Sequence, residues 1–448
     1  MTQKDLFKKY DVPAPRYTSY PTVPYWETTP TTIEWIESLN SAFEKPTASW
    51  AMYLHLPFCE TLCTFCGCNT TITKDHKRES GYSSLIHREF SYYMEKLPQL
   101  RKRPLEEMHL GGGTPTFFSP DNLKMLLAPI LDQIKVSDKI ERSIEVDPRR
   151  TTVEHLKALR ELGFNRVSMG VQDFDPEVQR LVNRIQPYEI TANLTRASRD
   201  LGFNSVNYDL IYGLPKQTEE SIVATVNKTV ELRPDRIALY SYAHVPWIKP
   251  AQRLFTEEDL PAGAEKRKLY ELSRSILTAV GYIEIGMDHF ALPSDTLYIA
   301  DKNKGLHRNF MGYTSRRTDV LLGLGVSAIS EAPSCFHQNE KVLTVYERRV
   351  EGREIPTARG HRLNADDMAA REQILSLMTK FETVLEESQV QDVKEFLRPL
   401  FEDGLVLLKG NTLLVPQEGR PFLRNACMAL DRRLRKNAPQ TKIFSQAL

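Results

Sequence analysis

Four of the six cysteines in this 448-residue chain lie within the ten residues from Cys59 to Cys68. Cys59, Cys63 and Cys66 are spaced C-x3-C-x2-C, which suits three thiolates closing on one face of an iron–sulfur cube. We expect the side chain of Cys68 to point away from that of Cys66, and the short span between them to prevent a fourth bond to the same cube. A cube with three protein ligands keeps one iron open, and an open iron can bind a small chelating molecule and pass it an electron.

A zinc site, disulfides and a ferredoxin-type cluster each fit the cysteine loop less well than a cluster held by three thiolates. Tetrahedral zinc sites usually take two ligand pairs from separated segments, and no second CxxC or HxxxH pair stands elsewhere in the chain. Disulfides need an oxidising compartment, and the N-terminal residues MTQKDLFKKYDVPAPRY contain no apolar signal-peptide core. Ferredoxin-type clusters use different cysteine spacings. The isolated Cys335 and Cys427 are expected to be small buried hydrophobic residues.

The composition is that of an ordinary globular protein, with 41% hydrophobic and 26% charged residues. The 59 basic and 58 acidic residues leave a formal charge of +1, which gives no reason to expect nucleic acid or an anionic membrane as a partner. No apolar run approaches the roughly 18–20 residues that span a bilayer. We therefore expect a cytoplasmic protein with reduced thiols, no nucleic-acid partner and no membrane span.

Apolar stretches of strand length alternate with helical segments from residue 51 onward. This alternation predicts an α/β fold in which a parallel sheet, covered by helices, curls into an incomplete (β/α)6 barrel. A further strand pair is expected near residues 321–329, and Thr32 is expected to cap an earlier helix. The predicted strands are 51–56, 106–110, 142–146, 166–171, 205–211 and 236–242. The predicted domains are an N-terminal lid segment (1–50), the barrel with extensions (51–350) and a small, mostly helical C-terminal domain (351–448).

Polar or flexible residues follow each predicted strand, at the end where α/β barrels bind ligands. The first strand ends at the cysteine loop, and the second runs into three glycines, Gly111–Gly113, that let a ligand approach the backbone closely. Glu145 ends the third strand, where a carboxylate can accept hydrogen bonds from a ribose diol. Each of these polar residues, taken alone, could instead cap a turn or form a surface ion pair. Their recurrence at one end of the sheet favours a shared ligand site, with Gln172, Arg184, Asp209 and residues 242–244 as further members.

Together these segments resemble the radical S-adenosylmethionine (SAM) enzymes and, more narrowly, the oxygen-independent coproporphyrinogen III oxidases, or coproporphyrinogen dehydrogenases. Cys68 and the N-terminal segment PRYTSYPT point to this family within the superfamily. The motifs that carry the resemblance run nearly from end to end: PRYTSYPT (15–22), YLHLPFCETLCTFCGCN (53–69), GGGTPT (111–116), EVDPR (145–149), SMGVQDF (168–174), NYDLIYGLP (207–215), HRNFMGYT (307–314) and LLGLGVSAIS (321–330).

The resemblance implies roles for individual residues. Cys59, Cys63 and Cys66 would hold a [4Fe–4S] cluster whose open iron binds SAM, and these cysteines with Tyr53 would be the catalytic residues. Whether two SAM molecules bind at once stays open, and Arg184 would serve equally well against a substrate propionate. The positions matching a first SAM site are Tyr53, Gly112, Glu145 and Ile329. Those matching a second SAM site are Phe65, Gly113, Thr114, Gln172, Arg184, Asp209 and Ala243.

The implied activity is the oxidative decarboxylation of two propionate side chains of coproporphyrinogen III to vinyl groups, which gives protoporphyrinogen IX in oxygen-independent haem biosynthesis. The resemblance leaves the electron donor and acceptor unidentified, and we expect a monomer. A haem-trafficking chaperone and a SAM-dependent haem-modifying enzyme are the alternatives. Cys68 and the roughly fifty residues before the cysteine motif favour the oxidase. Arg308 is a candidate for contact with the substrate.

Overall fold

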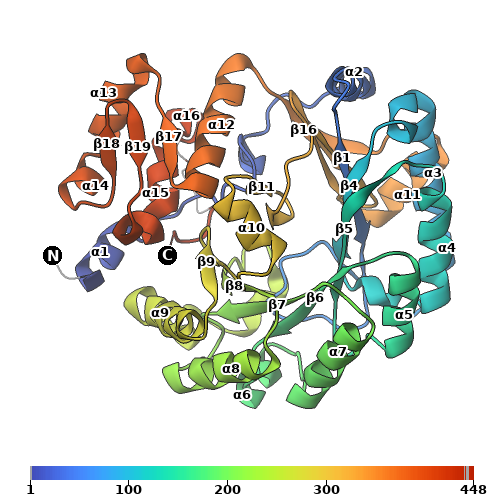
Figure 1. Ribbon diagram of the computed structural model, residues 1–448, viewed down its shortest axis with the longest axis horizontal. Helices are drawn as coiled ribbons and strands as arrows, with labels where there is room; N and C mark the ends of the chain where they lie inside the picture. Colours follow the sequence, from blue (N-terminus) through green and yellow to red (C-terminus); the bar gives the residue numbers. More distant parts are fainter. Residues whose placement is uncertain (1–2, 438, 440–442, 448) are drawn as a thin grey trace.

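The computed structural model describes residues 3–437, 439 and 443–447. A 12-stranded sheet forms its centre, in the order β16-β15-β14-β13-β1-β4-β5-β6-β7-β8-β10-β9 (Figure 1). The six predicted strands are confirmed as six neighbouring parallel strands of this sheet, which curves as predicted for an incomplete barrel. They are β1 (Trp50–Leu56), β4 (Leu105–Gly112), β5 (Val136–Val146), β6 (Arg166–Gln172), β7 (Ser205–Tyr212) and β8 (Arg236–Ser241).

The sheet continues beyond the six predicted strands on both sides. On one side β13 (Val320–Leu324) pairs with β1 in parallel, and β14 (Ile329–Ala332) then pairs with β13 antiparallel, which confirms the predicted strand pair. The antiparallel strands β15 (Cys335–Asn339) and β16 (Thr357–Arg362) follow. On the other side β10 (His289–Ala291) and β9 (Ile283–Ile285) extend β8 antiparallel. The sequence did not predict these additions in full because most are only three to five residues long.

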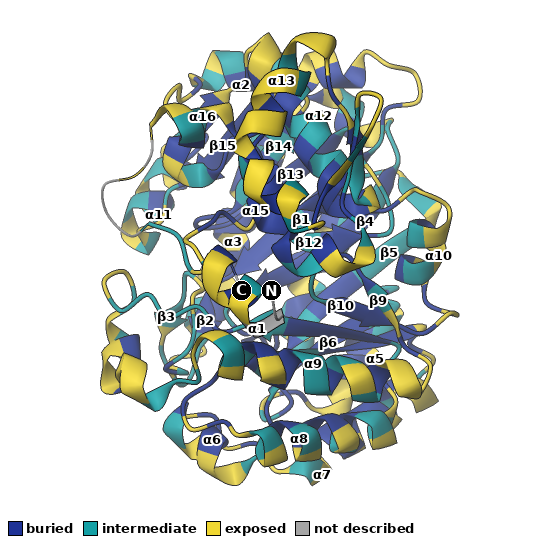
Figure 2. Cartoon of the chain, turned by 90° about the vertical axis from the view of Figure 1, so that its left-hand side faces the viewer, coloured by how far each residue is buried: buried dark blue, intermediate teal, exposed yellow. Residues whose placement is uncertain are grey.

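Helices cover the outer face of the parallel strands (Figure 1). Figure 2 shows their exposed outer surfaces and the buried strands behind them. Their apolar faces and the outward-facing strand residues form one large hydrophobic core, to which Leu54, Met108 and Val206 belong. These helices are α3 (Arg78–Lys96), α4 (Pro120–Leu131), α5 (Val153–Glu161), α7 (Tyr188–Asp200), α8 (Glu219–Leu232) and α9 (Gly263–Ala279), with the short α6 (Pro176–Leu181) before α7.

The helix α2 (Thr32–Phe43) packs Trp35, Leu39 and Phe43 into the same core. Its cap is Thr31, so the prediction of Thr32 was wrong by one residue. The Thr31 hydroxyl accepts from the backbone N–H of Glu34, and the Glu34 carboxylate accepts in return from the backbone N–H of Thr31. Such reciprocal bonding needs the glutamate three residues after the cap, and Thr31 has that spacing.

The C-terminal part has a hydrophobic cluster of its own, which also takes in the N-terminal segment. Phe7 and Tyr10 from α1 (Gln3–Tyr10) pack on Phe422, and Tyr17 and Tyr20 are buried in the same cluster. The elements of this part are α12 (Ala365–Lys380), β17 (Glu382–Val384), α13 (Glu387–Phe396), α14 (Arg398–Glu402), β18 (Leu407–Lys409), β19 (Thr412–Leu414), α15 (Leu423–Met428) and α16 (Arg432–Lys436). Residues 1–50, expected to be a lid, therefore contribute buried aromatic side chains to this cluster, within the part of the segment that the structure describes.

The buried guanidinium of Arg424 joins segments from both ends of the chain. It donates hydrogen bonds to the backbone carbonyls of Pro15 (2.9 Å), Gln446 (2.8 Å) and Ala447 (3.1 Å), and also to that of Ala14. Burial and the nearby charge of Arg16 lower the pKa of Arg424 to about 9, which leaves it charged at neutral pH. The two chain segments are thus held together by one cation at their centre.

Replacing Arg424 with methionine should release both segments. We expect the free energy of unfolding to fall by about 2–4 kcal/mol, because buried carbonyls lose a charged donor. We also expect faster proteolysis near residues 12–17. Chemical denaturation and limited proteolysis would measure these effects, with Arg398→Met as the control, since exposed Arg398 only pairs with Glu395 at 3.5 Å. Equal stability of the two variants would contradict the assigned role of Arg424.

Candidate active site

Two adjoining cavities open at the C-terminal ends of the parallel strands. The smaller, of about 230 Å³, is lined by the cysteine loop, and we call it the cysteine cavity. The larger, of about 1190 Å³, lies between β1, the cysteine loop and residues 248–251 and 310–311, and we call it the large cavity. Cys66, Gly112, Glu145 and Tyr240 line both. A group held at this shared wall would face both spaces.

The glycine loop after β4 is pressed against the start of the cysteine loop. The backbone N–H of Gly113 donates to the carbonyl of Leu56 (2.8 Å), and that of Thr114 donates to the carbonyl of Phe58 (2.9 Å). A Cβ atom on Gly113 would lie 2.6 Å from the backbone of Pro57, which is too close for any side chain. The contact brings the Thr114 hydroxyl to 3.3 Å from the sulfur of Cys59. The glycine at position 113 is thus required for packing of the two loops.

Two guanidinium groups approach the sulfur of Cys63. Arg149 and Arg184 each lie 3.7 Å from this sulfur, and both also bind Asp147. Burial alone would raise the pKa of Asp147, but Arg184 and Arg149 hold it below its usual range. Arg184 further donates to the carbonyl of Gly170 (2.6 Å). Positive charge next to this sulfur stabilises a thiolate, the form that binds metal.

The expectation that Cys66 and Cys68 point apart was wrong, because side chains two residues apart in an extended segment face the same side. The backbone N–H of Cys68 donates to the sulfur of Cys66 (3.4 Å). The thiol of Cys68 also contacts Cys66, and this hydrogen bond lowers the pKa of Cys66 to about 6. Burial, by contrast, raises the pKa of Cys59 to about 11. Cys335 and Cys427 are buried away from the loop, as expected.

The arrangement of the thiols fits a cluster better than a single ion. Within the described residues, no three His, Cys, Asp or Glu side chains are gathered closely enough to hold one metal ion. Cys59, Cys63 and Cys66 instead surround one side of the cysteine cavity. Sulfur ligands spread around a space suit a multi-iron group, and the neighbouring guanidinium groups suit its sulfur charge.

Glu145 stands at the wall between the two cavities. One carboxylate oxygen accepts from the backbone N–H of Gly112 (3.4 Å), and the other lies 3.3 Å from Nε2 of His109. Burial alone would raise the pKa of Glu145, but the contact with His109 holds it below its usual range. The ring of Tyr53 stacks on that of His109, with centroids 6.0 Å apart. Glu145 is therefore an ionised acceptor facing both cavities.

Asp209 forms a second polar position, deeper in the cysteine cavity. Its carboxylate accepts from the hydroxyl of Ser168 (3.0 Å) and from the side-chain amide of Asn207 (3.0 Å). Burial raises the pKa of Asp209. Gln172 lies on the same cavity wall, with a φ of 67° where β6 leaves the sheet.

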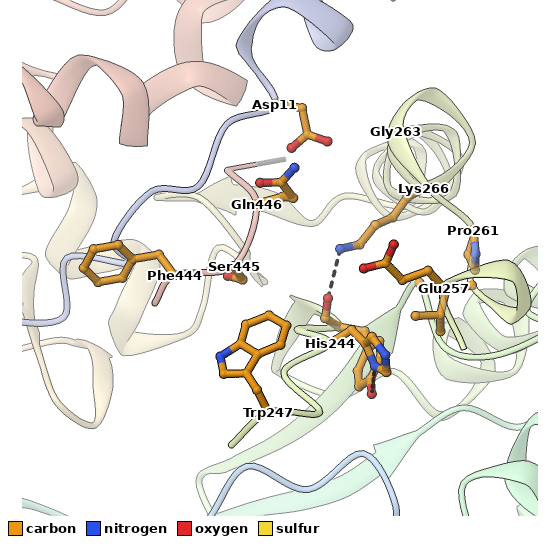
Figure 3. A pocket seen from close by; sticks show the side chains of 14 residues that line it. Asp11, His244, Trp247, Glu257, Pro261, Gly263, Lys266, Phe444, Ser445 and Gln446 are labelled. Atoms are coloured by element: carbon orange, nitrogen blue, oxygen red, sulfur yellow. Dashed lines mark hydrogen bonds between the residues drawn. The ribbon is translucent and has the colours of Figure 1, made fainter. Parts of the chain in front are cut away.

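Most of the predicted site residues come together in these cavities. Tyr53 and Ile329 line the large cavity. Ala243 lines neither of the two cavities, because the chain leaves the sheet after Ser241. Its neighbours Tyr242 and His244 line a third cavity, of about 250 Å³ (Figure 3). Those lining the cysteine cavity are Cys59, Cys63, Phe65, Cys66, Gly112, Gly113, Thr114, Glu145, Gln172, Arg184 and Asp209.

Several lining residues were missed by the sequence analysis. His55 and His109 alternate with core residues along β1 and β4, so the period of two could have identified them. Arg308, a candidate for substrate contact, lines neither cavity. Its guanidinium stacks over the ring of Tyr313 (4.4 Å) and donates to the backbone carbonyl of Arg16 (3.5 Å).

Comparison with known proteins first defines the class. The family model of the Radical SAM superfamily matches residues 53–229, which include the cysteine loop and the strands β4 to β7. A protein of this class uses a [4Fe–4S] cluster and SAM, as the thiol arrangement suggests. No helix in the described part of the chain is long and apolar enough to cross a membrane.

The relatives then define the family. The chain is 40% identical to the oxygen-independent coproporphyrinogen III oxidase of Escherichia coli over 450 residues, covering 97% of this chain and 96% of that protein. It is 38% identical to the oxidase of the same name from Pseudomonas aeruginosa, covering 96% and 95%. The solved coproporphyrinogen III oxidase from Escherichia coli, a radical SAM enzyme, superposes with a TM-score of 0.88 at 39% identity and covers 93% of this chain and 97% of that one. The chain belongs to the family of oxygen-independent coproporphyrinogen III oxidases.

The cysteine loop makes a direct prediction about iron binding. Replacing Cys59, Cys63 or Cys66 with alanine should abolish cluster loading, whereas Cys68→Ala should retain it. Iron and sulfide content and the electron paramagnetic resonance of the reduced protein would report the outcome. The buried Cys335→Ala is the matched control for loss of a thiol elsewhere. Loss of iron from Cys68→Ala would mean four protein ligands and no open iron.

Proposed function

We propose that this chain decarboxylates two propionate side chains of coproporphyrinogen III to vinyl groups and so produces protoporphyrinogen IX. The observation that carries the proposal is the shared wall of the two cavities. Cys66, Gly112 and Glu145 line both the cavity that would hold the cofactors and a neighbouring cavity of about 1190 Å³. That volume slightly exceeds the roughly 300–1,000 Å³ that is typical of small-molecule sites, and it suits a macrocycle.

The cofactors supply the radical chemistry. A [4Fe–4S] cluster held by Cys59, Cys63 and Cys66, together with SAM, would supply the one-electron radical chemistry that removes a hydrogen atom from the β-carbon of a propionate. The substrate then loses CO2 and one electron, and a vinyl group remains. A low-potential one-electron donor is required for the cluster, and a one-electron acceptor is required for the substrate. The protein's own contribution is binding, orientation and exclusion of water.

Residues at the shared wall would orient a first SAM. The ionised carboxylate of Glu145 can accept hydrogen bonds from a ribose diol while its other contacts, from Gly112 and His109, keep it in place. Tyr53 and Ile329 reach this region from the large cavity. Cys59, Cys63 and Cys66 would hold the cluster on the opposite side.

A second SAM would bind deeper in the cysteine cavity, and whether it is bound together with the first is a separate question. Phe65, Gly113, Thr114, Gln172 and Asp209 line this space. Arg184 also lines it and is already bound to Asp147 and Gly170. This placement favours a cofactor contact over a substrate contact for Arg184. Ala243 would need a movement of residues 242–244 to join the site.

The free cysteines, the packed chain ends and the position of Arg16 bear on the compartment, the oligomeric state and the lid. Unpaired thiols around the cluster site favour a reducing compartment such as the cytoplasm. The described parts of the N- and C-terminal segments pack on one another within the same chain, which favours a protein that works as a monomer. The lid role of residues 1–50 is compatible with the place of Arg16 on the wall of the large cavity.

An anaerobic turnover assay tests the proposed reaction. Reconstituted protein, SAM, a strong reductant, an electron acceptor and coproporphyrinogen III should give two successive losses of CO2 by mass spectrometry, with 5′-deoxyadenosine as the second product. Cys63→Ala should give neither. Cleavage of SAM with untouched porphyrinogen would refute the substrate assignment. Haem copurifying with the protein would then favour a haem-trafficking or haem-modifying role.

A further inference from the structure

The wall of the large cavity carries more positive than negative charge. Three basic side chains, those of Arg16, Lys249 and Lys341, line it. Among the described lining residues Glu145 is the one carboxylate, and it lies at the cofactor end, hydrogen-bonded to Gly112. Because basic side chains outnumber acidic ones on its wall, the cavity attracts an anion on the side away from the cofactors.

None of the three basic groups forms a direct ion pair with a carboxylate among the residues that the structure describes, although Arg16 lies close enough to Asp288 to help lower the pKa of that carboxyl. Arg16 donates to the backbone carbonyl of Ser241 (3.0 Å), and Lys249 donates to that of Cys68 (2.9 Å). A carbonyl satisfies a donor but does not neutralise its charge. Lys341 is exposed, and the nearby charge of Lys249 adds to burial in lowering its pKa.

Further cations surround Arg16 on its protein side. Burial and the charge of Arg16 lower the pKa of Lys266 to about 8. Figure 3 shows Lys266 in the third cavity, where its ammonium group donates to the carbonyl of Tyr242 (2.9 Å) and Asp11 lies on the same wall. The buried carboxylate of Asp288 is hydrogen-bonded to His289 (2.7 Å). The exposed guanidinium of Arg16 therefore faces the large cavity from a region rich in positive charge.

We propose that Arg16, Lys249 and Lys341 bind the propionate carboxylates of the porphyrinogen, including those that are not decarboxylated. The proposal rests on the proposed function and names the groups that recognise its substrate. Arg16 lies beside the end of β8, whereas Lys249 and Lys341 lie beside the cysteine loop, where Lys249 contacts Cys68 and the Lys341 carbonyl accepts from Asn69 (3.0 Å). Carboxylates at different edges of one macrocycle can thus be bound together, which fixes the ring orientation toward the cofactors.

Carboxylate recognition would also weaken binding as the reaction proceeds. Each decarboxylation removes one anionic group from the ligand, so the product offers fewer charges to the same three cations. The substrate is therefore held more firmly than the product, which assists release.

Binding of coproporphyrin III, the stable fluorescent oxidation product of the substrate, tests the proposal on cluster-loaded protein. The variants Arg16→Gln, Lys249→Gln and Lys341→Gln should each weaken binding by about tenfold or more, because a hydrogen bond to a charged group contributes on this scale. Arg16→Lys should restore part of the loss. In wild-type protein the affinity should fall with increasing salt. The tetramethyl ester, which keeps the macrocycle without its charges, should bind the wild type and the variants equally.

Lys139→Gln is the matched control, because Lys139 is exposed and lies outside both cavities. In turnover the three variants should raise KM for the porphyrinogen when they are compared with the wild type at equal cluster content. Unchanged coproporphyrin affinity in all three variants would overturn the proposal even if the wild type is an active oxidase. A wild type that neither binds coproporphyrin nor turns over would overturn the proposed function as well. Lys341 is exposed, so its variant gives a result even if another fails to fold.

Discussion

The alternation of side chains along the parallel strands is the constraint on which both cavities depend. On β1 the side chains of Met52 and Leu54 enter the hydrophobic core, while those of Tyr53 and His55 face the cavity. A slip of one residue in the pairing would exchange the two sets. The register that is formed pairs Tyr53 with His109 and so allows their rings to stack. Core packing therefore determines which residues can do chemistry.

The same register explains why the charges of the site are separated. His109 and Glu145 lie on neighbouring strands β4 and β5 and meet at the wall shared by both cavities. Arg184 and Arg149 come from segments that follow strands and gather beside Cys63. On the cofactor side, the guanidinium groups of Arg149 and Arg184 thus lie beside the sulfur of Cys63. Among the described residues, Glu145 is the one carboxylate that faces the large cavity. Such an arrangement can bind an anionic cluster and a cationic sulfonium within one small space.

Local patterns made much of the fold and site predictable. The six predicted strands are long enough for apolar runs to identify them. The motifs around the cysteines and Glu145 predicted that these residues share one site. The contact between Cys68 and the sulfur of Cys66 was predictable, because side chains two residues apart in an extended segment face the same side. Arg16, Lys249 and Lys341 belong to segments far apart in the chain and share no spacing. Only the folded chain brings them to one wall.

The two walls of the large cavity differ in how firmly they are held. Arg16 follows directly on Ala14 and Pro15, whose carbonyls are bound by the buried Arg424, so moving this wall breaks charge-assisted hydrogen bonds. Residues 247–254 are tied to the cysteine loop by Lys249, which donates to the carbonyl of Cys68, and by Gln252, which donates to that of Phe65, but Trp247 and Ile248 expose 45% and 57% of their surface. Segments with little buried surface open at the lowest free energy. The exposed stretch at Trp247 and Ile248 therefore costs less to displace than the N-terminal segment, where the buried Arg424 holds the carbonyls next to Arg16.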